Sequence, residues 1–254
     1  MNAKIKPFEE LTLKDDYMFK RVMSDKYICK KTLDLILSKK IRDIKYLEDE
    51  KSFKTSYISK GVRLDVYIED DKNTAYDIEM QVRSLQKVEL GKRIRYYQSA
   101  IDADTLKQNM PYKKLKESVI IFICPFKVFD GKRHLYTFKN FCKEDKRILL
   151  KDGATKIVLS TKGKSNDVDP KVTAFLKYIE NSLATEDDFV KDLDSAVKHI
   201  KNQETERASY MIYNMKMLEE KDISFKEGKK EGKKEGKKEG KKEGKKEGVK
   251  EGVK

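Results

Sequence analysis

Two runs of alternating polar and apolar residues, at residues 64–68 and 77–82, most constrain how this chain can fold. Period-2 alternation is typical of a strand, and two such runs split by a short polar segment predict a β-hairpin. If residues 71–73 form a three-residue loop, the register places Glu79 opposite Asp65. The hairpin therefore predicts two acidic side chains facing one another on neighbouring strands.

Directly opposed residues on one face of a hairpin have Cβ atoms roughly 4.5–5.5 Å apart, and like charges at that spacing repel. A divalent metal between Asp65 and Glu79 would neutralise them and leave positions open for water and a phosphate. Two alternatives need no metal. Arg63 lies opposite Gln81 in the same register and could neutralise the acids in part. The polar face of the hairpin could also simply lie in solvent.

The hairpin resembles the PD-(D/E)XK nuclease superfamily, in which Asp on one strand and Glu-x-Lys on the next hold a metal and order the attacking water. Here the second part is Glu79-Met80-Gln81, with glutamine where lysine is usual. This variant accompanies DYMFK at residues 16–20, RYY at residues 95–97 and a Lys-Glu-Gly tail. The ordered set resembles the Rpn family of recombination-promoting nucleases, often labelled transposases.

The resemblance implies a metal-dependent DNA endonuclease linked to recombination or transposition. Its metal is Mg²⁺ (or Mn²⁺), held by Asp65, Glu79 and a backbone carbonyl near Met80. The family pattern adds Asp16 as an acid near the metal, although an acid in the first turn of a helix also complements the helix dipole. The catalytic residues are then Asp65, Glu79 and Gln81.

Gln81 can orient a water through its carbonyl oxygen, but it lacks the positive charge of a lysine. The alternative function is therefore a catalytically weak or inactive nucleic-acid-binding or assembly protein that retains the nuclease fold. After the hairpin, Lys92, Arg93 and Arg95 are candidates for contacts with DNA phosphates. The alternative for these three cations is an exposed helix surface.

The formal net charge of +14 favours a polyanionic partner, either nucleic acid or an anionic membrane surface. Lysine as the default surface residue would give the same sum. The three cysteines form no Cys-x-x-Cys pair, and the two histidines are far apart, so a thiolate zinc site and a Ser-His-Asp hydrolase are poorly supported. We expect DNA as the partner.

Residues 1–13 mix charged and apolar side chains, so we expect no signal peptide. The strongest apolar run, residues 119–124, is far shorter than the roughly 20 residues that span a bilayer. We therefore expect a cytoplasmic, reduced protein with no membrane partner.

The predicted fold is a restriction-endonuclease-like mixed α/β sheet flanked by helices, with a helical extension and a low-complexity tail. The expected helices lie at residues 15–24, 27–37, 88–106, 172–183, 187–199 and 203–218. The expected strands lie at residues 41–53, in the hairpin 62–82, and at 119–124, 135–138 and 156–159.

Three segments follow from this order of elements. Residues 1–165 form the nuclease domain, 166–225 the helical extension and 226–254 the Lys-Glu-Gly tail. In the tail, Glu and Lys four residues apart favour a helix. Glycine at every fourth residue opposes it by about 1 kcal/mol each. We expect a frayed helix or a disordered tail, the alternative being a self-associating helix that builds a homo-oligomer.

Overall fold

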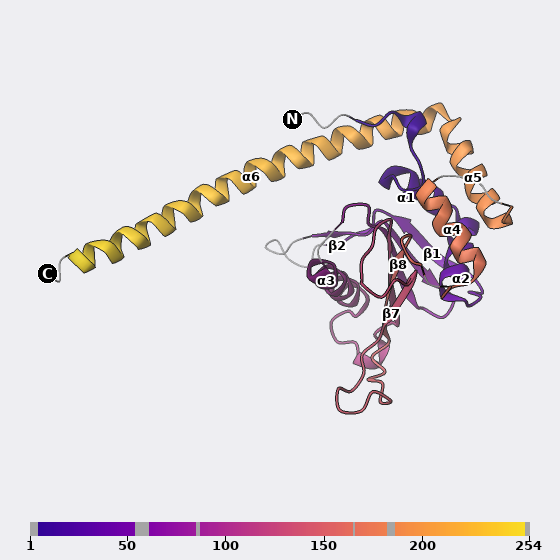
Figure 1. Ribbon diagram of the computed structural model, residues 1–254, viewed down its shortest axis with the longest axis horizontal. Coiled ribbons are helices and arrows are strands. Elements are labelled where there is room, and N and C mark those ends of the chain that lie inside the picture. The colour runs from indigo at the N-terminus through magenta and orange to yellow at the C-terminus, as the bar shows by residue number, and fades with distance from the viewer. Residues whose placement is uncertain (1–4, 54–60, 85–86, 165, 182–185, 252–254) are drawn as a thin grey trace. The chain divides into compact units, whose positions relative to one another are not determined.

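The computed structural model describes residues 5–53, 61–84, 87–164, 166–181 and 186–251 (Figure 1). The helices are α1 (Asp16–Met23), α2 (Lys26–Leu37), α3 (Lys87–Thr105), α4 (Pro170–Asn181), α5 (Asp188–Lys201) and α6 (Glu204–Glu251), with short 3₁₀ turns η1 (Phe8–Glu10) and η2 (Tyr112–Lys114). The strands are β1 (Ile44–Asp49), β2 (Ser52–Phe53), β3 (Val62–Arg63), β4 (Val66–Asp70), β5 (Ala75–Met80), β6 (Ser118–Cys124), β7 (Leu135–Phe138) and β8 (Ala154–Ser160).

Six of these strands form one mixed sheet in the order β1-β4-β5-β6-β8-β7, and β2 pairs with β3 separately. β4 and β5 are antiparallel, whereas β5, β6 and β8 run parallel. Helix α3 lies on one side of the sheet, and α1, α2, α4 and α5 lie on the other (Figure 1). The predicted mixed α/β sheet flanked by helices is confirmed.

Strand β6 is apolar along nearly its whole length because helices cover both of its faces. Ile120, Phe122 and Cys124 point into the cluster beneath α3, together with Leu90 and Ile101 of that helix. This packing fixes α3 over the middle of the sheet, and it therefore also fixes α3 over the neighbouring strand β5.

The β4–β5 hairpin has the predicted register. Val66 pairs with Ile78, and the backbone N–H of Asp70 donates to the Thr74 carbonyl oxygen at 3.1 Å, which closes a three-residue loop. One step beyond Val66 and Ile78, the same register brings Asp65 opposite Glu79.

The Asp70 carboxylate organises this loop from inside the protein. It accepts hydrogen bonds from the backbone N–H groups of Lys72 (2.9 Å) and Thr74 (2.8 Å) and from the Tyr76 hydroxyl (2.8 Å). Loop length sets hairpin register, and a slip of one residue turns every side chain to the other face. Asp70 therefore stabilises the register that brings the two acids together.

The chain divides into two compact units, one of residues Lys6–Gln203 and one of Met1–Ile5 with Glu204–Lys254. Within the first, α4 and α5 pack against each other and against α2, and α5 also packs against α1. The predicted segment boundaries at residues 165 and 225 stay predictions. Residues 182–183 of the predicted fourth helix lie outside the described residues.

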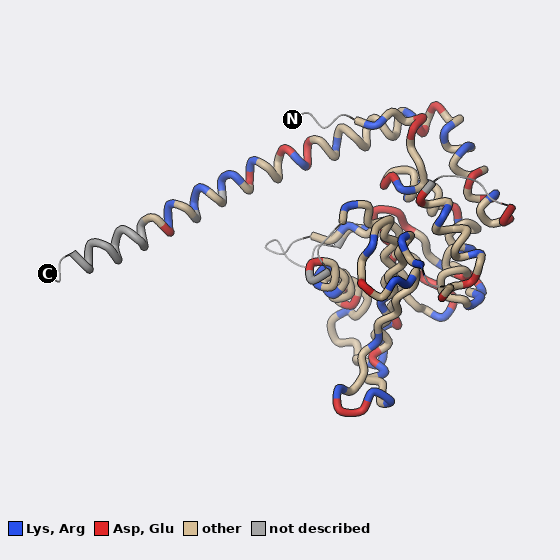
Figure 2. The backbone as a smooth tube through the Cα atoms, viewed as in Figure 1, with Lys and Arg blue, Asp and Glu red and all other residues tan. Residues whose placement is uncertain are grey.

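Helix α6 of the second unit continues through the Lys-Glu-Gly repeat to Glu251, with basic and acidic residues recurring along it (Figure 2). Residues 252–254 lie outside the described residues. Fraying concerns the stability of that helix, so the predicted frayed or disordered tail stays a prediction. Across the described residues, none of the helices has an apolar stretch long enough to cross a bilayer.

We predict that Asp70→Ala destabilises the protein, because it leaves buried donors without an acceptor at roughly 1–3 kcal/mol each. Chemical unfolding measures the effect. The matched control is Asp71→Ala, in the same loop but partly exposed, which should stay within about 0.5 kcal/mol of the wild type. Equal midpoints for the two variants would contradict a role for Asp70 in holding the hairpin.

Candidate active site

Strand β5 carries acidic side chains into the protein interior beneath α3. Asp77 is 0 % exposed and Glu79 2 %, and Asp65, directly before β4, is 9 % exposed. The alternative of a polar hairpin face lying in solvent is therefore wrong. The charge of these groups has to be balanced inside the protein, because an isolated buried carboxylate is very costly.

Backbone hydrogen bonds lock the two opposed acids to each other's strands. The backbone N–H of Asp65 donates to Glu79 Oε1 at 2.7 Å, and the backbone N–H of Met80 donates to Asp65 Oδ2 at 3.0 Å. Each carboxylate thus has one oxygen held by the opposite strand. The predicted metal ligands Asp65 and Glu79 are brought together at the carboxyl end of β5.

Burial shifts the titration of all three acids. Burial and then the charge of Asp16 raise the pKa of Asp65 to about 6. Burial, followed by the charge of Asp65, raises the pKa of Asp77 well above its ordinary value. Burial and the charges of Asp77 and Asp65 do the same for the pKa of Glu79. The cluster therefore favours taking up protons or another cation.

Of the three acids, Asp77 bears the largest energetic cost of burying a charge. Neither of its buried carboxylate oxygens has a hydrogen-bond donor among the described residues. Asp65 is the acid whose charge acts on it, and Glu79 can hydrogen-bond to it only while Glu79 is protonated. A shared proton or a cation would relieve the pair, so the orphaned oxygens indicate a site that accepts positive charge.

Lys20 approaches the acids from α1. Its ammonium lies 2.8 Å from Asp16 Oδ2, 3.3 Å from Glu50 Oε1 and 3.3 Å from Asp65 Oδ1. Asp16 is therefore brought near Asp65 by way of Lys20, and it also lies in the first turn of α1. Both interpretations of Asp16 fit this position.

Arg93 approaches from α3 on the other side. Its Nη2 lies 3.4 Å from Glu79 Oε2, and its Nη1 donates to the side-chain oxygen Oε1 of Gln81. Arg93 also donates to the Tyr97 hydroxyl through Nε (3.0 Å) and Nη2 (2.6 Å). The Gln81 amide in turn donates to the carbonyl oxygen of Arg83. The side chain of Gln81 thus holds Arg93, and a water would share its oxygen with that guanidinium.

Lys20 contacts Asp65 and Arg93 contacts Glu79 as neutralising cations. The part that the sequence analysis assigned to Arg63 stays a prediction. Lys20 and Glu50 were missed as site residues, because nothing in sequence spacing connects α1 with the end of β1. The signals that were present are the i,i+4 spacing of Asp16 and Lys20 and the place of Asp77 on the same strand face as Glu79.

The predicted phosphate-binding cations line a groove beside the acids. A cavity of about 940 Å³ is bordered by Gln81, Arg93, Lys92, Arg95 and Tyr96, and also by Arg83. Lys92 and Arg95 are exposed, whereas Arg93 is half-buried. The helix that follows the hairpin therefore presents cations to a groove that is also bordered by Gln81.

The donor set fits a hard divalent cation. The acids at the site are Asp16, Glu50, Asp65, Asp77 and Glu79, and the cations that contact them are Lys20 and Arg93. Oxygen ligands and this excess of negative charge suit Mg²⁺ or Mn²⁺. In the described ranges, no three acidic, His or Cys side chains already form a metal cage. Binding would therefore take two carboxylates completed by water, or a side-chain rotation.

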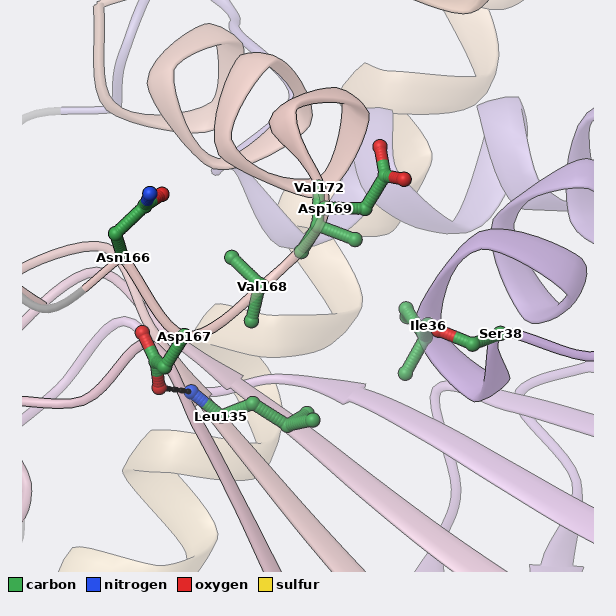
Figure 3. Close-up of a pocket in the computed structure, with 8 residues that line it drawn as sticks. All are labelled: Ile36, Ser38, Leu135, Asn166, Asp167, Val168, Asp169 and Val172. Atoms are coloured by element: carbon green, nitrogen blue, oxygen red, sulfur yellow. Dashed lines mark hydrogen bonds between the residues drawn. The ribbon is translucent and has the colours of Figure 1, made fainter.

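A second cavity, of about 330 Å³, lies between the end of α2 and the start of α4 (Figure 3). Its Asp167 carboxylate accepts hydrogen bonds from the backbone N–H groups of His134 (3.1 Å) and Leu135 (3.4 Å), and it pairs with His134 Nδ1 at 3.0 Å. These contacts fasten the segment before α4 to the beginning of β7. The Asp167 carboxylate in this cavity is thus engaged in holding the fold together.

Comparison with known proteins adds one finding. The sequence model of the family described as PD-(D/E)XK nuclease family transposase matches residues 13–234. This range includes α1, the hairpin, α3 and most of the C-terminal helices. Searches of the curated proteins and of the solved structures found no significant match.

We predict that, in EDTA, Asp77→Asn melts at a higher temperature than the wild type, and that the difference is larger at pH 8 than at pH 5. The raised pKa means that folding binds a proton here, so stability is lost as pH rises above the ordinary range of a carboxyl group. The asparagine amide carries no charge and can donate to Glu79.

The difference at pH 8 should be about 3 °C or more, at roughly 2–4 °C per kcal/mol for a chain of this size. Differential scanning fluorimetry across pH measures it, with Asp71→Asn as the control that removes an acid from the hairpin loop. A difference independent of pH would contradict a proton-binding Asp77.

Proposed function

The chain belongs to the PD-(D/E)XK nuclease family of transposases, and from that premise we propose that it is a metal-dependent endodeoxyribonuclease. The family supports a nuclease-type function and a DNA substrate. The observation that carries the proposal is the buried pair Asp65 and Glu79, each held by the backbone of the opposite strand. Evolution of a hairpin with two opposed buried acids makes physical sense when a cation binds there.

The residues proposed to hold Mg²⁺ or Mn²⁺ are Asp65, Glu79 and the backbone carbonyl of Met80, with Asp16 close behind. The chemistry that a bound ion supplies is polarisation of the scissile phosphate and a lowered pKa for a coordinated water. Gln81 holds Arg93 toward Glu79 through its side-chain oxygen, and the second lone pair of that oxygen would orient a water.

The groove lined by α3 is the proposed path of the DNA backbone. Lys92 and Arg95 are exposed and can pair with phosphates, whereas Arg93 at the inner end is placed beside the acids. Binding through such contacts releases counterions and weakens as salt rises. The Rpn family name and a role in recombination or transposition belong to the same proposal and rest on the family resemblance.

A second candidate function is a non-catalytic DNA-binding or assembly protein with the same fold. The observation that favours it is the occupation of the acids by protein cations, Lys20 on one side and Arg93 on the other. Such a protein would bind DNA through the groove and would not need a metal. Nicking of supercoiled plasmid with and without Mg²⁺ or Mn²⁺ separates the two candidates.

We predict that Asp65→Asn and Glu79→Gln each lower plasmid nicking by at least about 100-fold, because metal-ion stabilisation of the transition state is worth several kcal/mol. Both variants should keep the wild-type circular dichroism spectrum and should bind Mn²⁺ more weakly in titration calorimetry. Glu69→Gln, a partly buried acid of the same hairpin, serves as the control. Full activity in either site variant would refute the assignment.

We predict that deletion of residues 226–254 leaves the metal requirement and the melting temperature unchanged. The tail has almost no apolar side chains for a core. DNA affinity should fall modestly, and its salt dependence should become shallower, because fewer lysines meet phosphate and fewer counterions are released. Fluorescence anisotropy over a salt series measures this. A drop in subunit number by sedimentation would instead support the self-associating tail.

A further inference from the structure

The side chain of Lys20 occupies an unusual place for a lysine. It is 4 % exposed, and its ammonium lies within 3.3 Å of three carboxylates. Lysine is almost never fully buried unless it is paired. Helix α1 could bury an apolar residue at this position, as it does at Phe19 and Met23, so the ammonium has a purpose other than packing.

The electrostatics keep this lysine charged. Burial lowers the pKa of Lys20, but the carboxylates of Asp65 and Asp16 outweigh burial and hold that pKa above its ordinary value. The contact with Asp16 at 2.8 Å is a firm ion pair, whereas those with Glu50 and Asp65 are longer, at 3.3 Å. Asp16 thus anchors the ammonium at the edge of the candidate metal site.

The other cation at the site is less adaptable. Arg93 uses Nε, Nη1 and Nη2 for Tyr97, Gln81 and Glu79. The donors of a guanidinium are fixed in a rigid planar fork. The ammonium of a lysine sits on a flexible stem, so it can turn and direct its three donors toward a different acceptor. Lys20 is therefore the better candidate for a cation that shifts between the acids and an anionic ligand.

The residue at position 81 indicates which missing positive charge such a cation would supply. The family pattern (D/E)XK places lysine two residues after the acid, and this chain has Gln81 there. We propose that Lys20, delivered from α1, is the positioning residue that supplies the positive charge absent at position 81, sharing Asp65 with the bound metal. This inference rests on the proposed nuclease function and adds a residue to it.

The proposal has two separable consequences. A single positive charge beside Asp65 repels a divalent cation bound there, so Lys20 should weaken metal binding. A charge in the same place stabilises the negative charge that develops on the phosphate, so Lys20 should speed cleavage. A lysine that only held α1 in place would still repel the ion, but its replacement would slow cleavage only as far as it lowered stability.

The first test measures Mn²⁺ binding to the full chain by titration calorimetry. Lys20→Met keeps the length of the side chain and removes its charge. It should bind Mn²⁺ at least roughly tenfold more tightly, which is the effect that bulk-water screening would leave for a charge about 5 Å from the ion. Arg21→Met, the next residue on α1 and a half-exposed one, is the matched control and should leave the affinity nearly unchanged.

The second test is plasmid nicking at saturating Mn²⁺. Lys20→Met should lower kcat by at least about tenfold with little change in KM, and Arg21→Met should not. The double variant Lys20→Met with Gln81→Lys should recover most of the loss, because it returns a cation to the site from the neighbouring strand. Melting temperatures of all variants show whether a loss of activity reflects unfolding.

The outcomes separate the two levels of the proposal. A wild type that neither binds Mn²⁺ nor cleaves DNA overturns the proposed function, and with it the role of Lys20. An active wild type with unchanged Mn²⁺ affinity in Lys20→Met, or with no recovery in a folded double variant, overturns the role of Lys20 alone. Tighter Mn²⁺ binding combined with slower cleavage and recovery by Gln81→Lys supports it.

Discussion

The repulsion among the buried carboxylates of the β4–β5 hairpin governs the arrangement around it. Asp77 and Glu79 lie on a central strand under α3, where water cannot screen their charge. A cation has to come from elsewhere in the fold, and two helices provide one each. Lys20 reaches Asp65 from α1, and Arg93 reaches Glu79 from α3. Because these helices pack on opposite faces of the sheet, the acids are compensated from both sides at once.

This arrangement does not favour folding stability. Replacing a buried ion network by apolar residues is often neutral or stabilising, so such networks are weak arguments for stability. Here the Asp77 oxygens have no donor in the described part of the chain, and burial, with the mutual repulsion of the acids, raises the pKa of all three. Strongly shifted carboxyl groups beside a groove are typical of functional sites. In the proposed function, the energy stored in the unbalanced charge would contribute to the affinity for a divalent cation.

Local pattern was sufficient to predict the hairpin, because period-2 alternation and a three-residue loop together determine which residues face each other. The opposition of Asp65 and Glu79, the mixed sheet and the helix after the hairpin could therefore be predicted from the sequence alone. The residues that pair with the acids could not. Lys20 and Glu50 meet Asp65 only after α1 and the end of β1 are packed beside β4, and no spacing in the chain encodes that contact. The burial of the polar hairpin face also depends on tertiary packing, because α3 covers it.

The position of Arg93 illustrates how one substitution changes the tasks of its neighbours. A lysine at position 81 would bring its own charge to the acids, whereas a glutamine there brings a dipole that can both accept and donate. Gln81 uses its oxygen for Arg93 and its amide for the Arg83 carbonyl oxygen, so it orients a cation that belongs to α3. A single lysine could supply the charge and also place it. Here Arg93 of α3 supplies the charge, and Gln81, which follows β5, places it. A site built in this way depends on the packing of α3 against β6, and its function is tied to the core as closely as to its acids.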